Sequence, residues 1–123
     1  ILKKKPLNLL TVFAQSDVIG NFARQDKFNM TAKVLFEENK ELLMSFALRK
    51  QSAHDEMLLW IRGMRKKGYS KQLLCDTFLE LHISIQTDFR SKDDEEVYDA
   101  LSDFMDGFSS FGQNFILPDE PAI

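Results

Sequence analysis

The sequence predicts an all-α fold, a single-domain bundle of about five to six helices over residues 1–123. Three observations support this class. Apolar residues recur every three or four positions through most of the chain, few segments alternate with a period of two, and β-branched residues are sparse. With 123 residues and 44% hydrophobic residues, the chain has enough apolar material for one core. We find no internal repeat or linker, so we expect one domain.

The pattern before residue 52 predicts two short helices followed by a long one. Segments 7–13 and 16–23 each predict a short helix. A longer apolar pattern then runs from Met30 to Ala47. Its middle, Glu37–Glu41, is polar, but neither Gly nor Pro interrupts it, so we expect one continuous helix.

The ends of the next two helices are marked by their residue types. Ser52 stands three residues before Asp55, a spacing typical of the capping box at a helix start. Residues 65–67 are all basic and precede Gly68, which suits a helix C-terminus and a glycine just beyond it. Ser70 is then expected to cap the following helix.

That following helix carries the cleanest apolar stripe in the sequence. Its members are Leu74, Phe78, Leu81, Ile85 and Phe89, at spacings of three and four residues. We therefore expect a buried helix from Ser70 to Phe89. The wider core is expected to contain these residues: Leu42, Leu43, Phe46, Leu58, Trp60, Ile61, Leu74, Phe78, Leu81, Ile85, Leu101 and Phe104.

The last helix is expected to begin at Asp93, because Asp93 and Glu96 repeat the cap spacing. Its expected inward positions are Val97, Leu101, Phe104 and Phe108. Pro118 stops any regular structure before it, and the residues from about 118 onward predict a loose tail.

Charge is distributed unevenly along the chain. Residues 93–123 contain nine acids and no Lys or Arg, so this stretch carries −9 while the first 92 residues carry +6. The net charge is −3. One explanation is a solvated acidic helix that pairs with basic residues of the same chain, such as those at 62–71. The other is an acidic docking face for a basic partner.

Composition also limits compartment and chemistry. One Cys makes no internal disulfide, and no signal peptide or membrane-spanning run is visible, so we expect a cytoplasmic protein without membrane contact. Cys75 and His82 lie seven residues apart on one predicted helix, about 10 Å apart by the helical rise, which is too far for a nucleophile–base pair. We expect no catalytic residue, no metal and no cofactor.

The helix–turn–helix outline around Gly68 raises an alternative, a DNA-binding regulator. Basic residues surround this turn: Arg62, Arg65, Lys66, Lys67 and Lys71. However, Asp76 and Glu80 on the second helix, together with the acidic C-terminal stretch, oppose binding to a polyanion. We therefore expect a protein partner rather than nucleic acid. A regulatory adaptor that binds another protein is a further alternative.

Two segments carry a resemblance to a known family. These are residues 68–82, from Gly-Tyr-Ser-Lys to Leu-His, and residues 94–106, which begin Asp-Glu-Glu-Val-Tyr-Asp. Together they resemble small helical bacterial immunity proteins, which neutralise toxins of the colicin and contact-dependent inhibition type. The resemblance covers roughly the last half of the chain. It implies a cognate toxin domain as the partner, often a basic nuclease, bound through carboxylates between Asp93 and Asp106.

The predicted binding face follows from the amphipathic pattern of this last helix. Its outer surface is expected to display five carboxylates: Asp94, Glu95, Asp99, Asp103 and Asp106. Tyr98 and Phe111 are the expected aromatic anchors, because a few central aromatic contacts supply most of the affinity of an interface.

Overall fold

A computed structural model describes residues 30–109 and 114–123, and this part of the chain is helical with no strand. Its α-helices are α2 (Ala32–Glu38), α3 (Lys40–Leu48), α4 (His54–Lys66), α5 (Lys71–Ile85) and α6 (Glu95–Met105). Two 3₁₀-helices, η1 (Lys50–Ala53) and η2 (Asp106–Phe108), follow α3 and α6. The predicted all-α class is confirmed. The predictions for segments 7–13 and 16–23 and for Phe111 lie outside the described residues.

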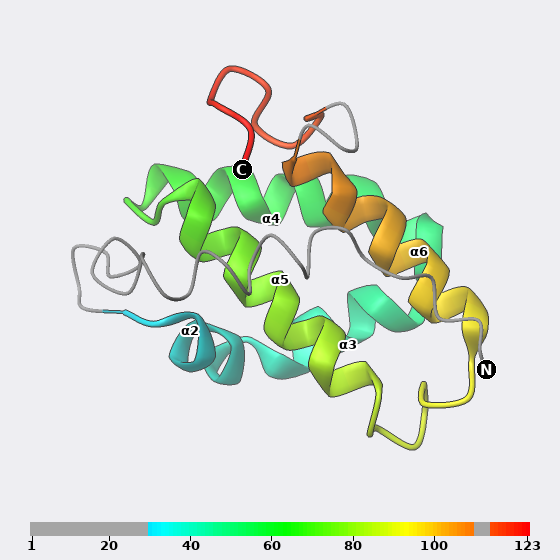
Figure 1. Ribbon diagram of the computed structural model, residues 1–123. Coiled ribbons are helices and arrows are strands. Elements are labelled where there is room, and N and C mark those ends of the chain that lie inside the picture. The colour runs from blue at the N-terminus through cyan, green and yellow to red at the C-terminus, as the bar shows by residue number, and fades with distance from the viewer. Residues whose placement is uncertain (1–29, 110–113) are drawn as a thin grey trace.

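Helix α5 is the central element of the described fold (Figure 1). It contacts α2, α3, α4 and α6, and ten of its fifteen residues are buried. The Ser70 side chain accepts a hydrogen bond of 3.0 Å from the Leu73 N–H, so the predicted N-cap is confirmed. Because α5 is surrounded, its polar side chains must also find partners inside the protein.

Aromatic rings join α5 to its neighbours. The ring centroid of Phe78 lies 5.9 Å from that of Trp60 on α4, 5.5 Å from Phe104 on α6 and 6.0 Å from Phe108 on η2. Phe78, Phe104 and Phe108 are fully buried. Tilted and edge-on ring pairs at these distances add to the stabilisation from buried apolar area. This cluster therefore joins α4, α5, α6 and η2 at one point.

The expected continuous helix over residues 30–47 is wrong, because the chain breaks at Asn39. The Asn39 side-chain Nδ2 donates to the Leu35 carbonyl at 2.9 Å, and its backbone N–H donates to the Phe36 carbonyl. Such side-chain bonding competes with helix continuation. The break gives α3 a new direction, so Leu43 is buried while Leu42, expected in the core, is 44% exposed.

The start of α4 also differs from the prediction. Ser52 does not cap this helix; its Oγ donates to the Arg49 carbonyl at 2.7 Å within η1. Ala53 occupies the cap position and makes no side-chain hydrogen bond there. The end of the helix is as predicted. Gly68 lies just beyond the cap residue Lys67 with a φ of 108°, a conformation that favours glycine.

The stripe of α5 ends earlier than predicted. The helix stops at Ile85, and Phe89, the last member of the expected stripe, is 83% exposed. The intervening loop is held by the buried Ser91 Oγ, which donates to the Ile85 carbonyl at 2.8 Å. Asp88 accepts two side-chain hydrogen bonds from Arg90, at 3.0 and 2.9 Å, and this guanidinium lowers the pKa of Asp88 to about 2.

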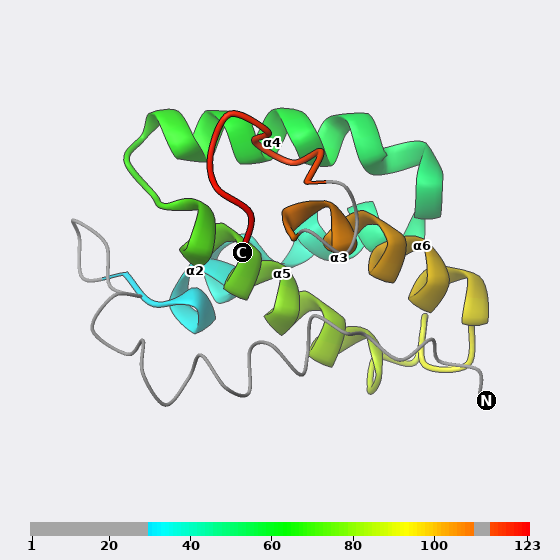
Figure 2. The same cartoon turned by 45° about the horizontal axis from the view of Figure 1, so that its top comes forward.

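Residues 114–123, here called the C-terminal segment, are packed rather than loose. Ile116 is fully buried, and its N–H donates to the Gly107 carbonyl at 3.0 Å. The N–H of Ile123 donates to the Phe108 carbonyl at 3.0 Å. The segment lies against α4 and the start of α5 (Figure 2). The prediction of a loose tail from about 118 is therefore wrong.

The Lys71 ammonium holds this segment from inside the fold. Only 5% of Lys71 is exposed, and its Nζ donates to Asn114 Oδ1 at 2.6 Å. Three backbone carbonyls also accept from it, those of Leu117 and Pro121 at 3.2 Å and that of Glu120 at 3.5 Å. Sequence reasoning missed this role, because a lysine in the first turn of a helix is usually solvated.

We expect Ser102→Ala to stabilise the protein. The Ser102 Oγ on α6 is fully buried and has no hydrogen-bond partner within the described residues. An unsatisfied buried hydroxyl is costly, so its removal should raise the free energy of unfolding by about 1 kcal/mol in urea denaturation. Ser91→Ala is the matched control, because it removes a buried hydroxyl that is bonded. A loss of stability in both variants would contradict the prediction.

Candidate protein-binding surface

Helix α6 is amphipathic, with a wholly acidic outer side. Its buried residues are Val97, Tyr98, Ala100, Leu101, Ser102, Phe104 and Met105, which include the predicted inward positions of this helix. Phe108, the remaining predicted inward residue, is also buried, in η2. Four exposed carboxylates, here called the acidic face, lie on the other side: Glu95, Glu96, Asp99 and Asp103. They extend about 12 Å along the helix.

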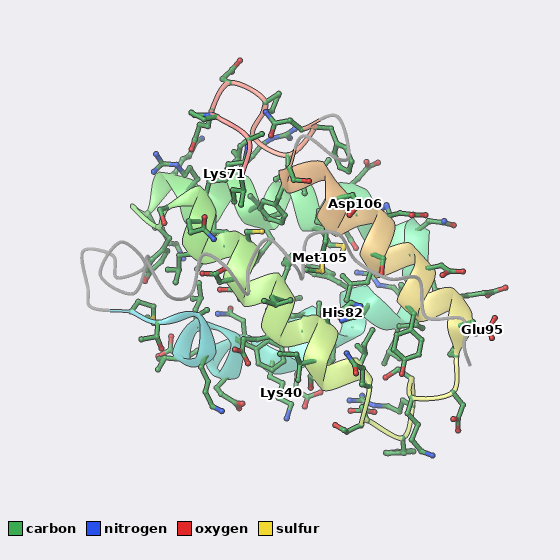
Figure 3. The ribbon with its side chains drawn as sticks, viewed as in Figure 1. Lys40, Lys71, His82, Glu95, Met105 and Asp106 are labelled. Atoms are coloured by element: carbon green, nitrogen blue, oxygen red, sulfur yellow. The ribbon has the colours of Figure 1, made fainter. Side chains whose placement is uncertain are left out.

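The start of α6 explains why these acids sit on a helix. Asp94, not Asp93 as predicted, is the N-cap, and its Oδ1 accepts from the N–H groups of Glu96 and Val97 at 3.0 and 3.4 Å. Glu95 and Glu96 follow in the first turn, where negative charge complements the helix dipole. Figure 3 shows Glu95 and Asp106 near opposite ends of α6.

Lys50 pairs with carboxylates at the start of this helix. Its Nζ lies 3.0 Å from Glu96 Oε1 and 3.5 Å from Asp94 Oδ2. The hydrogen bond to Glu96, and the charge of Asp94, raise the pKa of Lys50. Pairing with residues 62–71 was the competing expectation, but the ion pair observed from that region joins Arg65 to Glu120 at 2.9 Å.

The structure divides the predicted site residues into three groups. Glu95, Asp99 and Asp103 are exposed on the acidic face as expected. Asp94 and Asp106 are half-buried at the two ends of the helix. The remaining two predicted residues are the aromatic anchors, Tyr98 and Phe111.

Tyr98 is a correction, because it is 5% exposed and faces the interior. Its OH donates to the Lys92 carbonyl at 2.9 Å, and its ring centroid lies 6.3 Å from that of His82. Position 98 directly follows the inward Val97, so the width of the buried face includes it. Phe111 lies outside the described residues.

Sequence reasoning also missed two members of the surface. Glu96 was assigned only to capping, but its carboxylate is exposed and pairs with Lys50. Lys50 itself is brought to α6 by η1, which packs against that helix. Glu96 is identifiable from sequence, because residues 95, 96, 99 and 103 share one side of a helix. Lys50 is not, because its contact with α6 joins residues 46 positions apart.

Cys75 and His82 are both buried in α5, with 0% and 4% of their surface exposed. The Nδ1 of His82 lies 3.2 Å from Gln86 Nε2. Within residues 30–109 and 114–123, no three His, Cys, Asp or Glu side chains gather as metal ligands. No helix in this part of the chain is long and apolar enough to cross a membrane.

The basic cluster around Gly68 is split by the fold. Lys71 is buried, and Arg65 is paired with Glu120, so both hold the C-terminal segment. Only Arg62, Lys66 and Lys67 remain exposed without an ion pair to the described residues. Lys71, the residue expected to begin a DNA-reading helix, is therefore not available to DNA.

We expect acidification to destabilise the protein through His54. The neutral ring donates from Nε2 to the Ala100 carbonyl at 3.2 Å, and burial lowers the pKa of His54, although Ala100, Asp103 and Asp55 oppose that shift. As the pH falls, the imidazole of His54 therefore takes up a proton in the unfolded chain before it does so in the folded chain. The free energy of unfolding should then decrease as the pH drops through 6.5. Urea denaturation at pH 7.5 and 5.5 checks this. His54→Gln should reduce the difference, and an unchanged difference would contradict the assignment.

Comparison with known proteins gives no relative: no protein-family model, no curated protein and no solved structure matches the chain. The most distinctive feature of the described surface is the row of exposed carboxylates on α6, whose first turn pairs with Lys50.

Proposed function

We propose that the protein is a single-domain helical bundle that acts as a protein-binding module and recognises a basic partner through the acidic face of α6. The observation that carries this proposal is the exposure of Glu95, Glu96, Asp99 and Asp103 on one side of one helix. Lys50 offsets part of this charge at the first turn. Asp99 and Asp103 lie further along the helix and remain exposed.

The proposed partner is a cognate toxin domain, which the protein neutralises in the cytoplasm as an immunity protein does. A nuclease domain that binds phosphates presents a basic surface, which a row of carboxylates complements. The resemblance of residues 68–82 and 94–106 to helical immunity proteins favours this partner over a general adaptor. We propose no catalytic role and no cofactor for the chain itself.

The charge of the acidic face is expected to act mainly on the rate of association. Complementary potentials steer encounter, whereas affinity comes from a few central contacts. The effect should weaken as salt rises, because the screening length falls to about 8 Å at physiological ionic strength. A salt-dependent association rate is therefore the signature of this function.

The proposal predicts that Asp99→Lys/Asp103→Lys slows association about tenfold or more at low salt. If the reading frame next to this gene encodes a toxin domain, that domain is the partner for the measurement, and stopped-flow mixing gives the rate. Both side chains are exposed, so the melting temperature should change little. The loss should shrink in high salt.

The control is Glu37→Lys/Asp119→Lys, which changes the net charge equally at exposed positions away from α6. The association rate of this control should fall below the wild-type rate by a much smaller factor than that of Asp99→Lys/Asp103→Lys. A stable Asp99→Lys/Asp103→Lys variant that binds at the wild-type rate in low salt would reject the acidic face as the binding site.

A further inference from the structure

We infer that a groove between α2 and α4 is a second protein-binding site, which takes an acidic peptide segment carrying an apolar side chain. The groove has a volume of about 400 Å³, which lies in the range of ligand sites. Leu35, Trp60, Met64 and Tyr69 form its apolar part. The helix break at Asn39, which also lines it, leaves the groove open beside α4.

The apolar residues at the floor of this groove pack against the core. Leu35 is 1% exposed, and the half-buried Trp60 ring packs 5.9 Å from the fully buried Phe78 ring. Met64 and Tyr69 are joined by a hydrogen bond of 3.3 Å from the Tyr69 N–H to the Met64 carbonyl. A rigid apolar floor lets a ligand side chain dock with little loss of conformational entropy in the protein.

Gly63 is the second reason to expect a ligand here. It lies within α4, is exposed, and an added Cβ would meet nothing within 4 Å. Its φ is negative; among the described glycines, Gly68 is the one with a positive φ. Glycine within a helix is unfavourable, and neither space nor backbone conformation requires it here. A glycine that lines a groove permits a ligand to approach the helix backbone closely.

The charge around Gly63 indicates which ligand fits. Gly63 lies between the groove-lining Lys67 on one side and the row formed by Arg62 and Lys66 on the other. These three cations are exposed and make no ion pair with the described residues. Glu38 is the carboxylate that lines the groove. A segment that crosses α4 at Gly63 therefore meets uncompensated positive charge.

An acidic peptide uses both features, the apolar floor and the cations. Leu59, one turn before Gly63, is 63% exposed and extends the apolar contact along α4. Nucleic acid would use the cations alone, because its phosphates gain nothing from a groove lined by Leu35 and Met64. An acidic peptide is therefore the expected ligand of the groove, and duplex DNA is not.

The test is selection of displayed 16-residue peptides from an unbiased library on the full-length protein. Enriched peptides should be rich in Asp and Glu and contain a large apolar residue. Trp60 is the only tryptophan, so its emission should shift to shorter wavelength when a synthetic copy of an enriched peptide binds. Calorimetry should show at least about tenfold weaker binding to Gly63→Trp, which fills the groove, and to Lys66→Glu/Lys67→Glu.

Ser45→Trp is the matched control, because it places the same side chain at an exposed position on α3. It should bind as the wild type does. Gly63→Ala should keep the fold and raise the melting temperature, which separates loss of the groove from loss of folding. If Gly63→Trp misfolds, the doubly charge-reversed variant decides alone.

Three outcomes would overturn the proposal. Selection enriches no peptide, enriched peptides carry no acidic bias, or they bind Gly63→Trp as tightly as wild type. Duplex DNA that binds through Lys66 and Lys67 and is insensitive to Gly63→Trp would also overturn it, in favour of nucleic acid. None of these outcomes bears on the acidic face of α6, which uses different residues and an oppositely charged partner.

Discussion

Lys71→Met is expected to lower the free energy of unfolding by about 3 kcal/mol and to release the C-terminal segment from the fold. Four oxygen atoms of this segment lie within hydrogen-bonding distance of the ammonium: Asn114 Oδ1 and the carbonyls of Leu117, Glu120 and Pro121. Methionine has a similar length and no donor. The variant therefore removes a charged donor from several partly buried acceptors at once, which is more costly than the loss of one solvated bond.

The same surroundings explain how a lysine is tolerated at this depth. Burial lowers the pKa of Lys71, while the carboxylate of Glu120 opposes that shift. The ring of oxygen acceptors around Nζ replaces the water that the ammonium would otherwise bind. A buried charge with matched acceptors persists, and removal of either side is destabilising.

Hydrogen exchange separates local release from global unfolding in Lys71→Met. In the variant we expect faster exchange at the N–H groups of Ile116 and Ile123, which are hydrogen-bonded to the carbonyls of Gly107 and Phe108. The N–H groups in the middle of α5 should exchange as slowly as in the wild type, once the rates are corrected for the change in global stability. Arg65→Met is the control, because it removes an exposed ion pair to Glu120 and should cost at most about 1 kcal/mol. Equal stability of Lys71→Met and the wild type would contradict the role of the ammonium.

Sequence reasoning succeeded where local chemistry decides the structure. Ser70 as a cap and Gly68 as the residue after α4 were predictable, because both act on a backbone within three residues. The inward stripe of α6 was predictable for the same reason, since the helical period fixes which side chains share a face. These features place the acidic face without any knowledge of the rest of the fold.

Sequence reasoning failed where one side chain competes with the regular backbone. The side-chain amide of Asn39 ends α2 by hydrogen bonding to the Leu35 carbonyl. The sequence does not predict this helix end, because Asn also occurs at solvated positions within helices. The role of Lys71 was not predictable for a different reason. Its partners lie 43 to 50 positions away, and only the folded chain brings their oxygens together.

The same distinction between local and long-range effects applies to the candidate site. Glu95, Asp99 and Asp103 follow from the period of α6, whereas Tyr98 was assigned to the wrong side because the buried arc of this helix is wider than a narrow stripe. The groove beside α4 was not predictable. It is lined by Asn39, where the break between α2 and α3 was not expected.

The second large effect is expected for Phe78→Ala, which should lower the free energy of unfolding by about 3–5 kcal/mol. Phe78 is fully buried and touches rings from α4, α6 and η2. Truncation removes these ring contacts and leaves a cavity where α4, α5, α6 and η2 meet. Since the Trp60 ring packs on Phe78, the tryptophan emission of the folded variant should also move toward longer wavelength as water gains access.

Phe89→Ala provides the matched control, because the sequence places both phenylalanines on one apolar stripe. If the helix continued to Phe89, the two truncations would have comparable costs. In the structure α5 ends at Ile85 and 83% of Phe89 is exposed, so Phe89→Ala should change stability by no more than about 0.5 kcal/mol. Urea denaturation of both variants measures the contrast. Comparable losses would show that the stripe, rather than the helix end at Ile85, describes the folded protein.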